Sequence, residues 1–485
     1  MTLYNNTNLS LFTDFYELTM MQGYYLYNRN YSVVFDMAFR KQPFSGGYTV
    51  FAGLEPLVKA ILNLKFTDTE LTYLKGLNLF KPEFLDYLSK FRFNGDIYSV
   101  EEGELIFPEE PILRIHSNII EAQLIETLIL NIINFQSLIA TKTARITDSA
   151  KGKPILEFGA RRAQGIDGAL SASRAAYIGG AYATSNVLAG RLFNIPVRGT
   201  MAHSWIMSFG SEQESFDKYV RLYPNNTILL VDTYNTLKQG IPAAIKTLKK
   251  LKKRKITGFG IRLDSGDLEY LSSQARYMLD KAGLKETKIV VSNELDEHII
   301  EHLINNNAPI DYFGVGTNLV TGNDCPSLSG VYKLVARKNG KLYTPIIKIS
   351  NNPGKTTNPG VKNVLRLYDK DGFITGDLIF MESEKNMINK RLTDKSGFMF
   401  YHPKYDYQKI EITGYNSGKI MLKNIVLNGK LNYQFPKLNK IRELAGINIR
   451  KLHPSFKRLL NPHIYKVSIS KNLTKLKFGL IKKYE

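Results

Sequence analysis

Four short segments of this chain combine residue types that bind anions or transfer protons, and each follows or ends an apolar run. They are Glu157-Phe158-Gly159-Ala160-Arg161-Arg162, Gly199-Thr200-Met201-Ala202-His203-Ser204, Arg262-Leu263-Asp264-Ser265-Gly266-Asp267 and Gly314-Val315-Gly316-Thr317. We interpret this set as a site for a substrate with several phosphates, a sugar and a flat anionic ring. The reaction class would be displacement of a phosphate group at an activated sugar carbon, which depends on positioning and electrostatics more than on a protein nucleophile.

One candidate pair is Arg262 and Asp264. In an extended strand, residues two apart point to the same face. A guanidinium group offers a planar fork for a carboxylate or phosphate. The neighbouring carboxylate can orient sugar hydroxyls or help to hold Mg²⁺ together with substrate phosphates. The alternative is an ion pair that closes the end of a strand, and the two roles can coexist.

His203 lies three residues after a predicted strand end, with Thr200 and Ser204 nearby. An imidazole in this position can serve as a general base, or as a nucleophile that accepts a phosphoryl group. A hydrogen-bonded structural histidine is the alternative, and the residue types alone leave both open.

Glycine spacing at Gly314-Val315-Gly316-Thr317 favours phosphate binding. Glycines let the backbone approach a phosphate, and successive N–H groups form an anion nest. The segment comes late in its series of strands, where barrel enzymes often bind phosphate. Ser327-Leu328-Ser329-Gly330 would be the neighbouring loop. A plain turn is the alternative.

Phe158 and Arg161 form the last candidate pair. The aromatic ring could stack on a flat substrate ring, and the guanidinium could bind an anion. A buried aromatic residue followed by surface arginines explains the same residues equally well.

All these segments belong to a repeated β-then-α pattern between Pro154 and Leu334. Continuous Val, Ile and Leu runs are typical of buried parallel strands, and they occur at residues 155–159, 196–200, 227–232, 257–264, 288–293 and 312–317. Ligands bind at the carboxyl ends of the strands in such sheets and barrels. Successive strands start about 23 to 32 residues apart, the size of one βα unit. We therefore expect a barrel-like closure with one polar rim.

The pattern predicts an α/β protein with three regions. Residues 1–120 form an N-terminal α+β domain, 121–345 a central α/β barrel-like catalytic domain of parallel βα units, and 346–485 a small basic C-terminal region. In the first region, Phe12–Tyr25 has helical spacing with Asp14 as a possible cap, and Val33–Arg40 is predicted to be a strand.

Local signals mark further element ends. Asp267 and Gly283 are expected to begin and end a helix over residues 268–284. A loop dense in Pro, Gly and Asn covers residues 351–360, and turns are expected at Asp371-Gly372 and Asn428-Gly429.

Composition excludes several classes of protein. With 485 residues, 44% of them hydrophobic, the chain can form more than one core. No run of about 18 apolar residues indicates a membrane span. The single cysteine, Cys325, permits no internal disulfide and fits a reducing cytosol, so we expect a cytoplasmic protein.

The net charge of +21 invites a nucleic-acid interpretation, but +17 of it lies from residue 346 onward, away from the predicted rim. A solvated basic face is the simplest explanation, and attraction of anionic substrates is the next. Specific nucleic-acid binding ranks third because no stacking-and-basic motif of the known modules occurs.

The motifs, taken together and in order, resemble the nicotinate phosphoribosyltransferase family. The resembling stretches outside the four segments above are residues 12–20, Phe44-Ser45-Gly46-Gly47-Tyr48, Pro353-Gly354-Lys355 and Val361-Lys362-Asn363-Val364-Leu365-Arg366. The resemblance covers residues 12 to about 366, and it is vague beyond 370.

The resemblance implies that nicotinate and 5-phosphoribosyl 1-diphosphate are joined to give nicotinate mononucleotide and diphosphate, with ATP hydrolysis coupled to turnover. This reaction begins NAD salvage. The family also implies Mg²⁺, with no protein ligand assigned here, and a homodimer whose partner subunit donates the N-terminal tyrosine to a shared active site.

Residue roles follow from the same resemblance. His203 would be phosphorylated by ATP, and Asp264 would meet ribose hydroxyls or Mg²⁺. Substrate contacts would come from Tyr16 and Phe158 around the pyridine ring, from Arg161, Thr200 and Arg262 at nicotinate or ribosyl groups, and from Gly316, Thr317 and Gly330 at the 5-phosphate.

Two positions bear on the alternatives. The family pattern leads us to expect two glycines where this chain has Ser329-Gly330, which narrows the loop. Ser185 carries no carboxylate that would accept the amide of nicotinamide and repel nicotinate. A nicotinamide-specific transferase and a basic nucleic-acid binder on an inactive enzyme scaffold remain the competing interpretations.

Overall fold

The computed structural model describes residues 8–351, 355–405 and 407–484 of the chain, which divides into two compact units. The first unit combines Met1–Thr141 with Ser327–Glu485, and the second is Lys142–Pro326. The expected division at residues 120 and 345 stays a prediction, since compactness groups segments that are distant in sequence. Within the described ranges, no helix has the length and apolar composition needed to cross a membrane.

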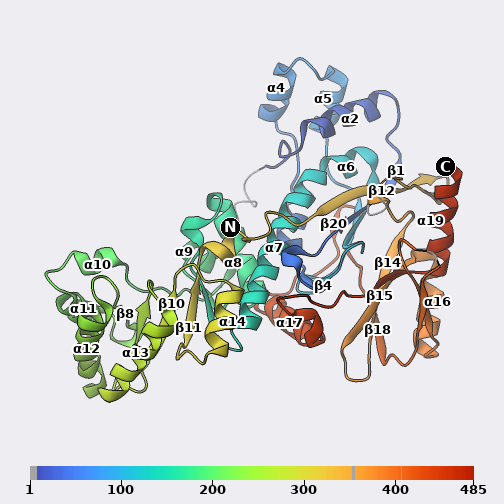
Figure 1. Cartoon of the computed structure of the whole chain (residues 1–485). Coiled ribbons are helices and arrows are strands. Elements are labelled where there is room, and N and C mark those ends of the chain that lie inside the picture. Colours follow the sequence, from blue (N-terminus) through green and yellow to red (C-terminus); the bar gives the residue numbers. More distant parts are fainter. Residues whose placement is uncertain (1–7, 352–354, 406, 485) are drawn as a thin grey trace. The chain divides into compact units, whose positions relative to one another are not determined.

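The second unit is built on a six-stranded parallel sheet in the order β7-β6-β11-β10-β9-β8 (Figure 1). Its strands are β6 Ile155–Glu157, β7 Ala183–Thr184, β8 Ile228–Leu230, β9 Gly260–Leu263, β10 Lys288–Ser292 and β11 Tyr312–Val315. Leu229, Ile261, Ile289 and Phe313 are fully buried in these strands. This burial explains the continuous apolar runs, and the predicted α/β class with a central parallel sheet is confirmed.

One predicted strand is wrong. In the run at 196–200, only Val197 forms an isolated parallel bridge, with Thr184. The place beside β6 is taken by β7, whose two residues are too short to produce an apolar run. β7 and β8 are the ends of the strand order, so among the described residues no ladder of hydrogen bonds closes the barrel-like series into a ring.

Helices follow the strands as expected. They are α8 Gly165–Ile178, α9 Val187–Phe193, α10 His203–Met207, α11 Glu212–Leu222, α12 Ile241–Lys253, α13 Leu268–Lys281, α14 Glu297–Asn305 and α15 Thr317–Val320. The α13 boundaries confirm the predicted signals. The Asp267 side chain accepts a hydrogen bond from Tyr270 N at 3.0 Å, and Gly283 adopts a φ of 79° just beyond the helix. Glycine suits this left-handed position because it has no Cβ.

The first unit contains a seven-stranded antiparallel sheet in the order β13-β12-β1-β5-β3-β19-β20. Its strands are β1 Ser32–Phe39, β3 Asp96–Ser99, β5 Leu113–Asn118, β12 Gly330–Asn339, β13 Leu342–Pro345, β19 Lys423–Leu427 and β20 Lys430–Leu431. The predicted strand at 33–40 is confirmed as β1, which lies between β12 and β5. The C-terminal β19 pairs with β3, so segments more than 300 residues apart share this sheet.

The N-terminal part of the first unit also contains six helices that the structure describes. They are α2 Phe15–Leu26, α3 Leu54–Leu62, α4 Asp68–Gly76, α5 Pro82–Ser89, α6 Ile119–Leu124 and α7 Glu126–Ser149, the last of which extends past Thr141 into the second unit's range. Asp14 occupies the N-cap position of α2, but its side chain accepts a hydrogen bond from Thr127 Oγ1 at 2.7 Å instead of a backbone N–H. The predicted side-chain cap is therefore wrong.

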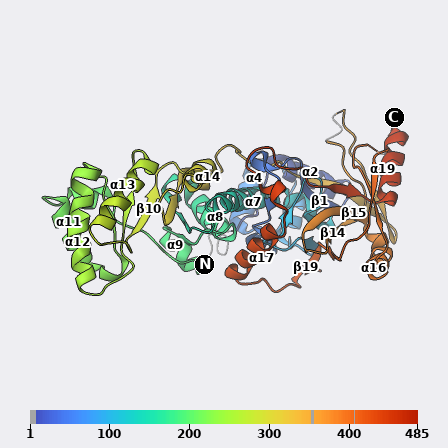
Figure 2. The same ribbon diagram turned by 60° about the horizontal axis from the view of Figure 1, so that its bottom comes forward.

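The C-terminal residues form a third sheet in the order β17-β16-β21-β15-β14-β18. Its strands are β14 Lys362–Tyr368, β15 Ile374–Met381, β16 Phe398–Tyr401, β17 Lys409–Ile412, β18 Ser417–Ile420 and β21 Val467–Ile469; the helices of this segment are α16 Lys385–Thr393, α17 Leu438–Arg450, α18 Pro454–Lys457 and α19 Lys471–Tyr484. Figures 1 and 2 both show α16 and α19 beside this sheet. The predicted turns at Asp371-Gly372 and Asn428-Gly429 connect β14 to β15 and β19 to β20.

Smaller elements complete the first unit. The sheet of β2 Thr49–Val50 and β4 Leu105–Ile106 has two strands, and the 3₁₀ turn at Pro43–Ser45 lies at the predicted turn. In the predicted loop at 351–360, residues 352–354 lie outside the described residues.

Candidate active site

Arg262 joins the carboxyl ends of β9 and β10 in the second unit. Its Nε donates to Ser292 Oγ at 2.8 Å, Nη1 to Thr200 Oγ1 at 2.9 Å and Nη2 to Asp264 Oδ1 at 2.7 Å. Its side chain is only 12% exposed. Three donors of one planar group thus fix three side chains, which is a geometry that lysine cannot reproduce.

Asp264 receives hydrogen bonds on its Oδ1 from both Arg262 and Ser292. Burial alone would raise the pKa of Asp264, but the Arg262 charge, the hydrogen bonds from Ser292 and Arg262, and the nearby His203 together hold that pKa below its usual value. The carboxyl group is therefore ionised at neutral pH and keeps the guanidinium in place.

His203 begins α10 and faces the same carboxylate. Its Nδ1 lies 3.1 Å from Thr233 Oγ1, and its Nε2 lies 3.7 Å from Asp264 Oδ2. The side chain is 38% exposed. The ring is thus held at Nδ1, and Nε2 makes only the longer contact with Asp264, a geometry compatible with the predicted general base or phosphoryl acceptor.

Asp232 is a buried neighbour that the sequence reasoning missed. Its Oδ2 accepts hydrogen bonds from Asp264 N and Ser265 Oγ, both at 2.7 Å. Its Oδ1 is also buried and has no hydrogen-bond partner among the described residues. The signal available in the sequence was its position directly after the apolar run at 228–231, where polar residues reach the rim.

The aromatic ring of Phe158 also lies close to Arg262. The guanidinium carbon is 5.6 Å from the centre of the Phe158 ring, within the range of a cation–π contact. The preceding Glu157 is fully buried and accepts hydrogen bonds from Gly159 N at 2.5 Å and Ser173 Oγ at 2.9 Å. Glu157 therefore shapes the loop that presents Phe158.

The predicted phosphate loop lies directly against Phe158. Phe158 N donates to Val315 O at 2.8 Å, and a Cβ placed on Gly314 would come within 2.7 Å of the Phe158 ring. Gly316 and Thr317 are half-buried at the start of α15. These contacts connect the loop to Phe158 and, through its ring, to Arg262.

The structure thus brings five predicted residues of the second unit into one connected set: His203, Asp264, Arg262, Thr200 and Phe158. Gly316 and Thr317 directly follow Val315, whose carbonyl oxygen accepts the hydrogen bond from Phe158 N. Arg161 is exposed on the 3₁₀ turn Ala160–Arg162, which contacts α15. Tyr16 and Gly330 belong to the first unit.

In the first unit, Tyr16 lies on α2 with 47% of its surface exposed, while Gly330 begins β12. A Cβ placed on Gly330 would lie 2.0 Å from Asn134 Oδ1, so a larger residue there would require the Asn134 side chain to move. The preceding Ser329 uses its hydroxyl to accept hydrogen bonds from Arg40 N at 3.1 Å and Lys41 N at 2.9 Å. These bonds give the serine found in place of an expected glycine a local structural role.

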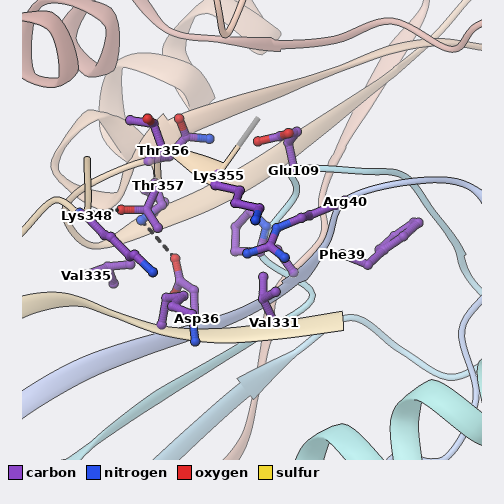
Figure 3. Close-up of a pocket in the computed structure, with 15 residues that line it drawn as sticks. Asp36, Phe39, Arg40, Glu109, Val331, Val335, Lys348, Lys355, Thr356 and Thr357 are labelled. Atoms are coloured by element: carbon purple, nitrogen blue, oxygen red, sulfur yellow. Dashed lines mark hydrogen bonds and ion pairs between the residues drawn. The ribbon is translucent and has the colours of Figure 1, made fainter. Parts of the chain in front are cut away.

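A basic pocket of the first unit was not predicted (Figure 3). Its lining includes the cationic side chains Arg40, Lys333, Lys348, Lys355 and Lys362. Of these, Lys362 is buried and pairs with Asp36 at 2.8 Å. Figure 3 shows the ends of the Lys355 and Arg40 side chains converging. Two like charges that converge favour an anionic ligand between them.

Comparison with known proteins identifies the family. Models of the nicotinate phosphoribosyltransferase N-terminal domain, family and C-terminal domain match residues 11–134, 154–388 and 361–477. The nicotinate phosphoribosyltransferase of Bacillus subtilis is 42% identical over 471 residues, which cover 97% of this chain and 94% of that protein. The chain belongs to the nicotinate phosphoribosyltransferase family.

More distant relatives agree over the whole length. The human nicotinate phosphoribosyltransferase is 30% identical, with 96% of this chain and 95% of that protein covered. The crystal structure of human nicotinic acid phosphoribosyltransferase superposes with a TM-score of 0.84 at 28% identity and covers 96% of this chain and 99% of that one. The resemblance seen in the motifs therefore extends beyond residue 370, through the C-terminal sheet.

Proposed function

We propose that this enzyme joins nicotinate to 5-phosphoribosyl 1-diphosphate, giving nicotinate mononucleotide and diphosphate, with ATP hydrolysis coupled to turnover. The observation that carries the proposal is the contact set of Arg262, Asp264 and His203 at the carboxyl ends of parallel strands, in a chain of this family. The reaction is the first step of NAD salvage from nicotinate.

His203 is the proposed phosphoryl acceptor. Its Nε2 attacks the γ-phosphorus of ATP, the bond from that phosphorus to the bridging oxygen breaks, and ADP leaves. Thr233 at Nδ1 supports this choice of nitrogen, because a ring held there presents Nε2. The ionised Asp264, 3.7 Å from Nε2, stabilises positive charge on the ring.

Binding roles follow the surroundings of each residue. Phe158 and Tyr16 would enclose the pyridine ring, with Tyr16 supplied by the second subunit of a homodimer. Arg262 and Thr200, which hold each other at 2.9 Å, would meet nicotinate or ribosyl groups. The exposed Arg161 would bind an anionic group of the substrate.

Phosphate groups would be held by backbone and basic side chains. Gly316 and Thr317 lie at the helix start beside Phe158, and Gly330 keeps β12 close to α7; these three are proposed at the 5-phosphate. The basic pocket around Arg40 and Lys355 is proposed to bind a further phosphate of a substrate.

Magnesium fits the available oxygen ligands. Among the described residues no cluster of three or more metal-ligating side chains occurs. Mg²⁺ typically uses one or two carboxylates together with substrate phosphates, and the unpartnered Asp232 Oδ1 beside Asp264 offers such a carboxylate oxygen. Bound Mg²⁺ would neutralise phosphate charge during transfer.

The deciding experiment is a transfer assay on the purified protein. With nicotinate, 5-phosphoribosyl 1-diphosphate and Mg²⁺ we expect nicotinate mononucleotide and diphosphate, formed faster with ATP. The two pyridines should also be supplied in competition. Preference for nicotinamide would favour the nicotinamide-specific alternative, whereas the lack of a carboxylate at Ser185 leads us to expect preference for nicotinate. Lack of turnover together with RNA affinity that falls steeply with salt would favour the nucleic-acid binder. We place the enzyme in the cytoplasm.

A further inference from the structure

The helix α10, which carries His203, is too short to fix its own orientation. It has five residues, His203–Met207, and its N-cap position is occupied by Ala202, whose side chain cannot accept a backbone N–H. An isolated helix of this length is unstable in water. The direction of the His203 ring therefore depends on contacts between α10 and its surroundings.

Among the described residues, two side chains of α10 form hydrogen bonds with other elements. His203 Nδ1 lies 3.1 Å from Oγ1 of Thr233, which follows β8. Trp205 Nε1 donates to Ser215 O of α11 at 3.2 Å. Because an α-helix turns by about 100° per residue, these two side chains leave α10 about 200° apart, on nearly opposite sides. The short helix is thus held from two sides.

The Trp205 ring also packs against aromatic side chains. Its centre lies 4.8 Å from the centre of the Phe209 ring, which follows α10, and 5.9 Å from that of the Tyr219 ring on α11, in an edge-to-face arrangement. Aromatic pairs at such separations are more favourable than their buried area alone would give. Figure 1 shows α10 beside α11. Trp205 therefore joins the two helices by both a polar and an apolar contact.

The helix α11 is in turn bound to α12. Asp217 of α11 accepts hydrogen bonds from Thr247 Oγ1 at 2.8 Å and from Lys250 Nζ at 2.7 Å, both on α12. Thr247 Oγ1 also accepts a hydrogen bond from Gln213 of α11 at 2.8 Å. Like Thr233, α12 follows β8 in the chain. Both contacts that hold α10 therefore lead to the same βα unit.

We propose that Trp205 is a positioning residue for His203, because it fixes the rotation of α10 that directs the imidazole Nε2. The inference rests on the proposed function, in which His203 accepts a phosphoryl group from ATP. A side-chain tip about 5–6 Å from a helix axis moves by about 2 Å when the helix rotates by about 20°. Nε2 lies 3.7 Å from Asp264 Oδ2, so a rotation of this size would alter that contact. Misplacing a reacting group by about 1 Å can lower a rate by about 100-fold.

The test measures how much ATP accelerates nicotinate mononucleotide formation, as the rate with ATP divided by the rate without it. Loss of folded protein lowers both rates in proportion and leaves this ratio unchanged, whereas misdirection of His203 lowers the ratio. In Trp205→Leu, which lacks both the donor and the ring, the acid-labile label from γ-labelled ATP should form roughly 100-fold more slowly, and the ratio should fall toward one. The transfer without ATP should persist, because Arg262 and Thr200 hold each other.

A milder variant covers the case in which Trp205→Leu fails to fold. Trp205→Phe keeps an aromatic ring but lacks the N–H, so the label should form about fivefold more slowly, the equivalent of one neutral hydrogen bond. Leu279→Ala is the matched control, since its side chain is fully buried on α13, outside α10 and α11. It should lower the midpoint of thermal unfolding and keep the wild-type ratio. A wild-type ratio and labelling rate in the folded Trp205 variants would overturn the proposal.

Trp205 also gives a readout that needs no turnover, because it is the only tryptophan of the chain. Thr233→Val removes the other hydrogen bond that holds α10. If the two contacts fix one helix together, this variant should shift the tryptophan emission and increase its quenching by acrylamide, while Leu279→Ala should change neither. Identical emission and quenching in the wild-type and Thr233→Val proteins would contradict the two-sided hold, and the positioning role with it.

Failure of the proposed function gives a different pattern, which the wild-type protein alone reveals. If ATP neither accelerates the wild-type transfer nor labels the protein, His203 is not the phosphoryl acceptor, and the role of Trp205 falls with it. If the wild-type protein is accelerated and labelled but the Trp205 variants match it, the proposed function stands and only the positioning role is overturned.

Discussion

Replacing Arg262 with lysine tests the candidate site at its most connected residue. The three guanidinium nitrogens donate to Ser292, Thr200 and Asp264 over 2.7 to 2.9 Å. One ammonium group can keep the carboxylate but cannot span the two hydroxyls as well. Each lost hydrogen bond to a charged donor is worth about 1.5–3 kcal/mol. Because the site is not fully buried, water can hydrogen-bond to the groups left without the guanidinium and offset part of this loss. We therefore expect a loss of about 1.5–3 kcal/mol, or roughly 10- to 150-fold in kcat/KM.

The chain supplies a matched control for this substitution. Arg276 on α13 also makes three hydrogen bonds, to Asp280 Oδ1 at 2.8 Å, Thr287 O at 2.7 Å and Leu284 O at 2.9 Å. None of these partners belongs to the candidate site. Arg276→Lys should lower the midpoint of thermal unfolding about as much as Arg262→Lys while leaving kcat/KM near the wild-type value. If Arg262→Lys keeps kcat/KM within twofold, the guanidinium fork has no part in the reaction.

Three further substitutions separate chemistry from stability. His203→Asn should leave slow nicotinate mononucleotide formation but abolish its acceleration by ATP, together with the acid-labile label from γ-labelled ATP; continued acceleration would remove the histidine from the mechanism. Gly330→Ala should lower the free energy of unfolding in urea by about 1–3 kcal/mol, since its Cβ would lie 2.0 Å from a side-chain oxygen of α7, whereas Gly23→Ala, with open space, should not. Arg366→Met should cost about 3–5 kcal/mol by leaving the buried Asp377, now 2.6 Å away, without its cation; unchanged thermal unfolding would show that another group compensates.

Arg262 and Asp264 were accessible to sequence reasoning because their positions follow from strand periodicity. Arg262 and Asp264 are two residues apart on β9, so both side chains leave the same face at its carboxyl end. The two side chains form a salt bridge at 2.7 Å, so the ion pair considered as the alternative is present in the structure. It coexists with the proposed role in binding, since the same carboxylate also faces His203.

The supporting polar contacts were not accessible in the same way. Ser292 and Thr233 are common residue types at strand ends, and nothing in their spacing distinguishes them from solvent-exposed neighbours. Their partners are 30 residues away in each case, at Arg262 and His203. Such contacts depend on the parallel register of adjacent strands, which a single sequence does not fix.

In the first unit, the pairing of strands that are distant in sequence was even less predictable. Its interior strand β1 pairs with β12, so that Val33 lies opposite Arg337 across about 300 residues of sequence. Local patterns predicted β1 itself but not its neighbour, since hydrophobic alternation identifies a strand without naming its partner. The basic pocket was not predicted for the same reason, since it brings together residues that are distant in sequence. Arg40 follows β1, while Lys355 comes from a loop near the C-terminal sheet.

Asp264 connects the residues of the candidate site to one another. Its Oδ1 holds Arg262 and Ser292, while its Oδ2 faces His203 at 3.7 Å. A carboxylate whose pKa is held low by its surroundings stays ionised at neutral pH. The carboxylate that holds the guanidinium proposed to bind substrate therefore also lies beside the histidine proposed to accept the phosphoryl group, so the two proposed roles share one charged side chain.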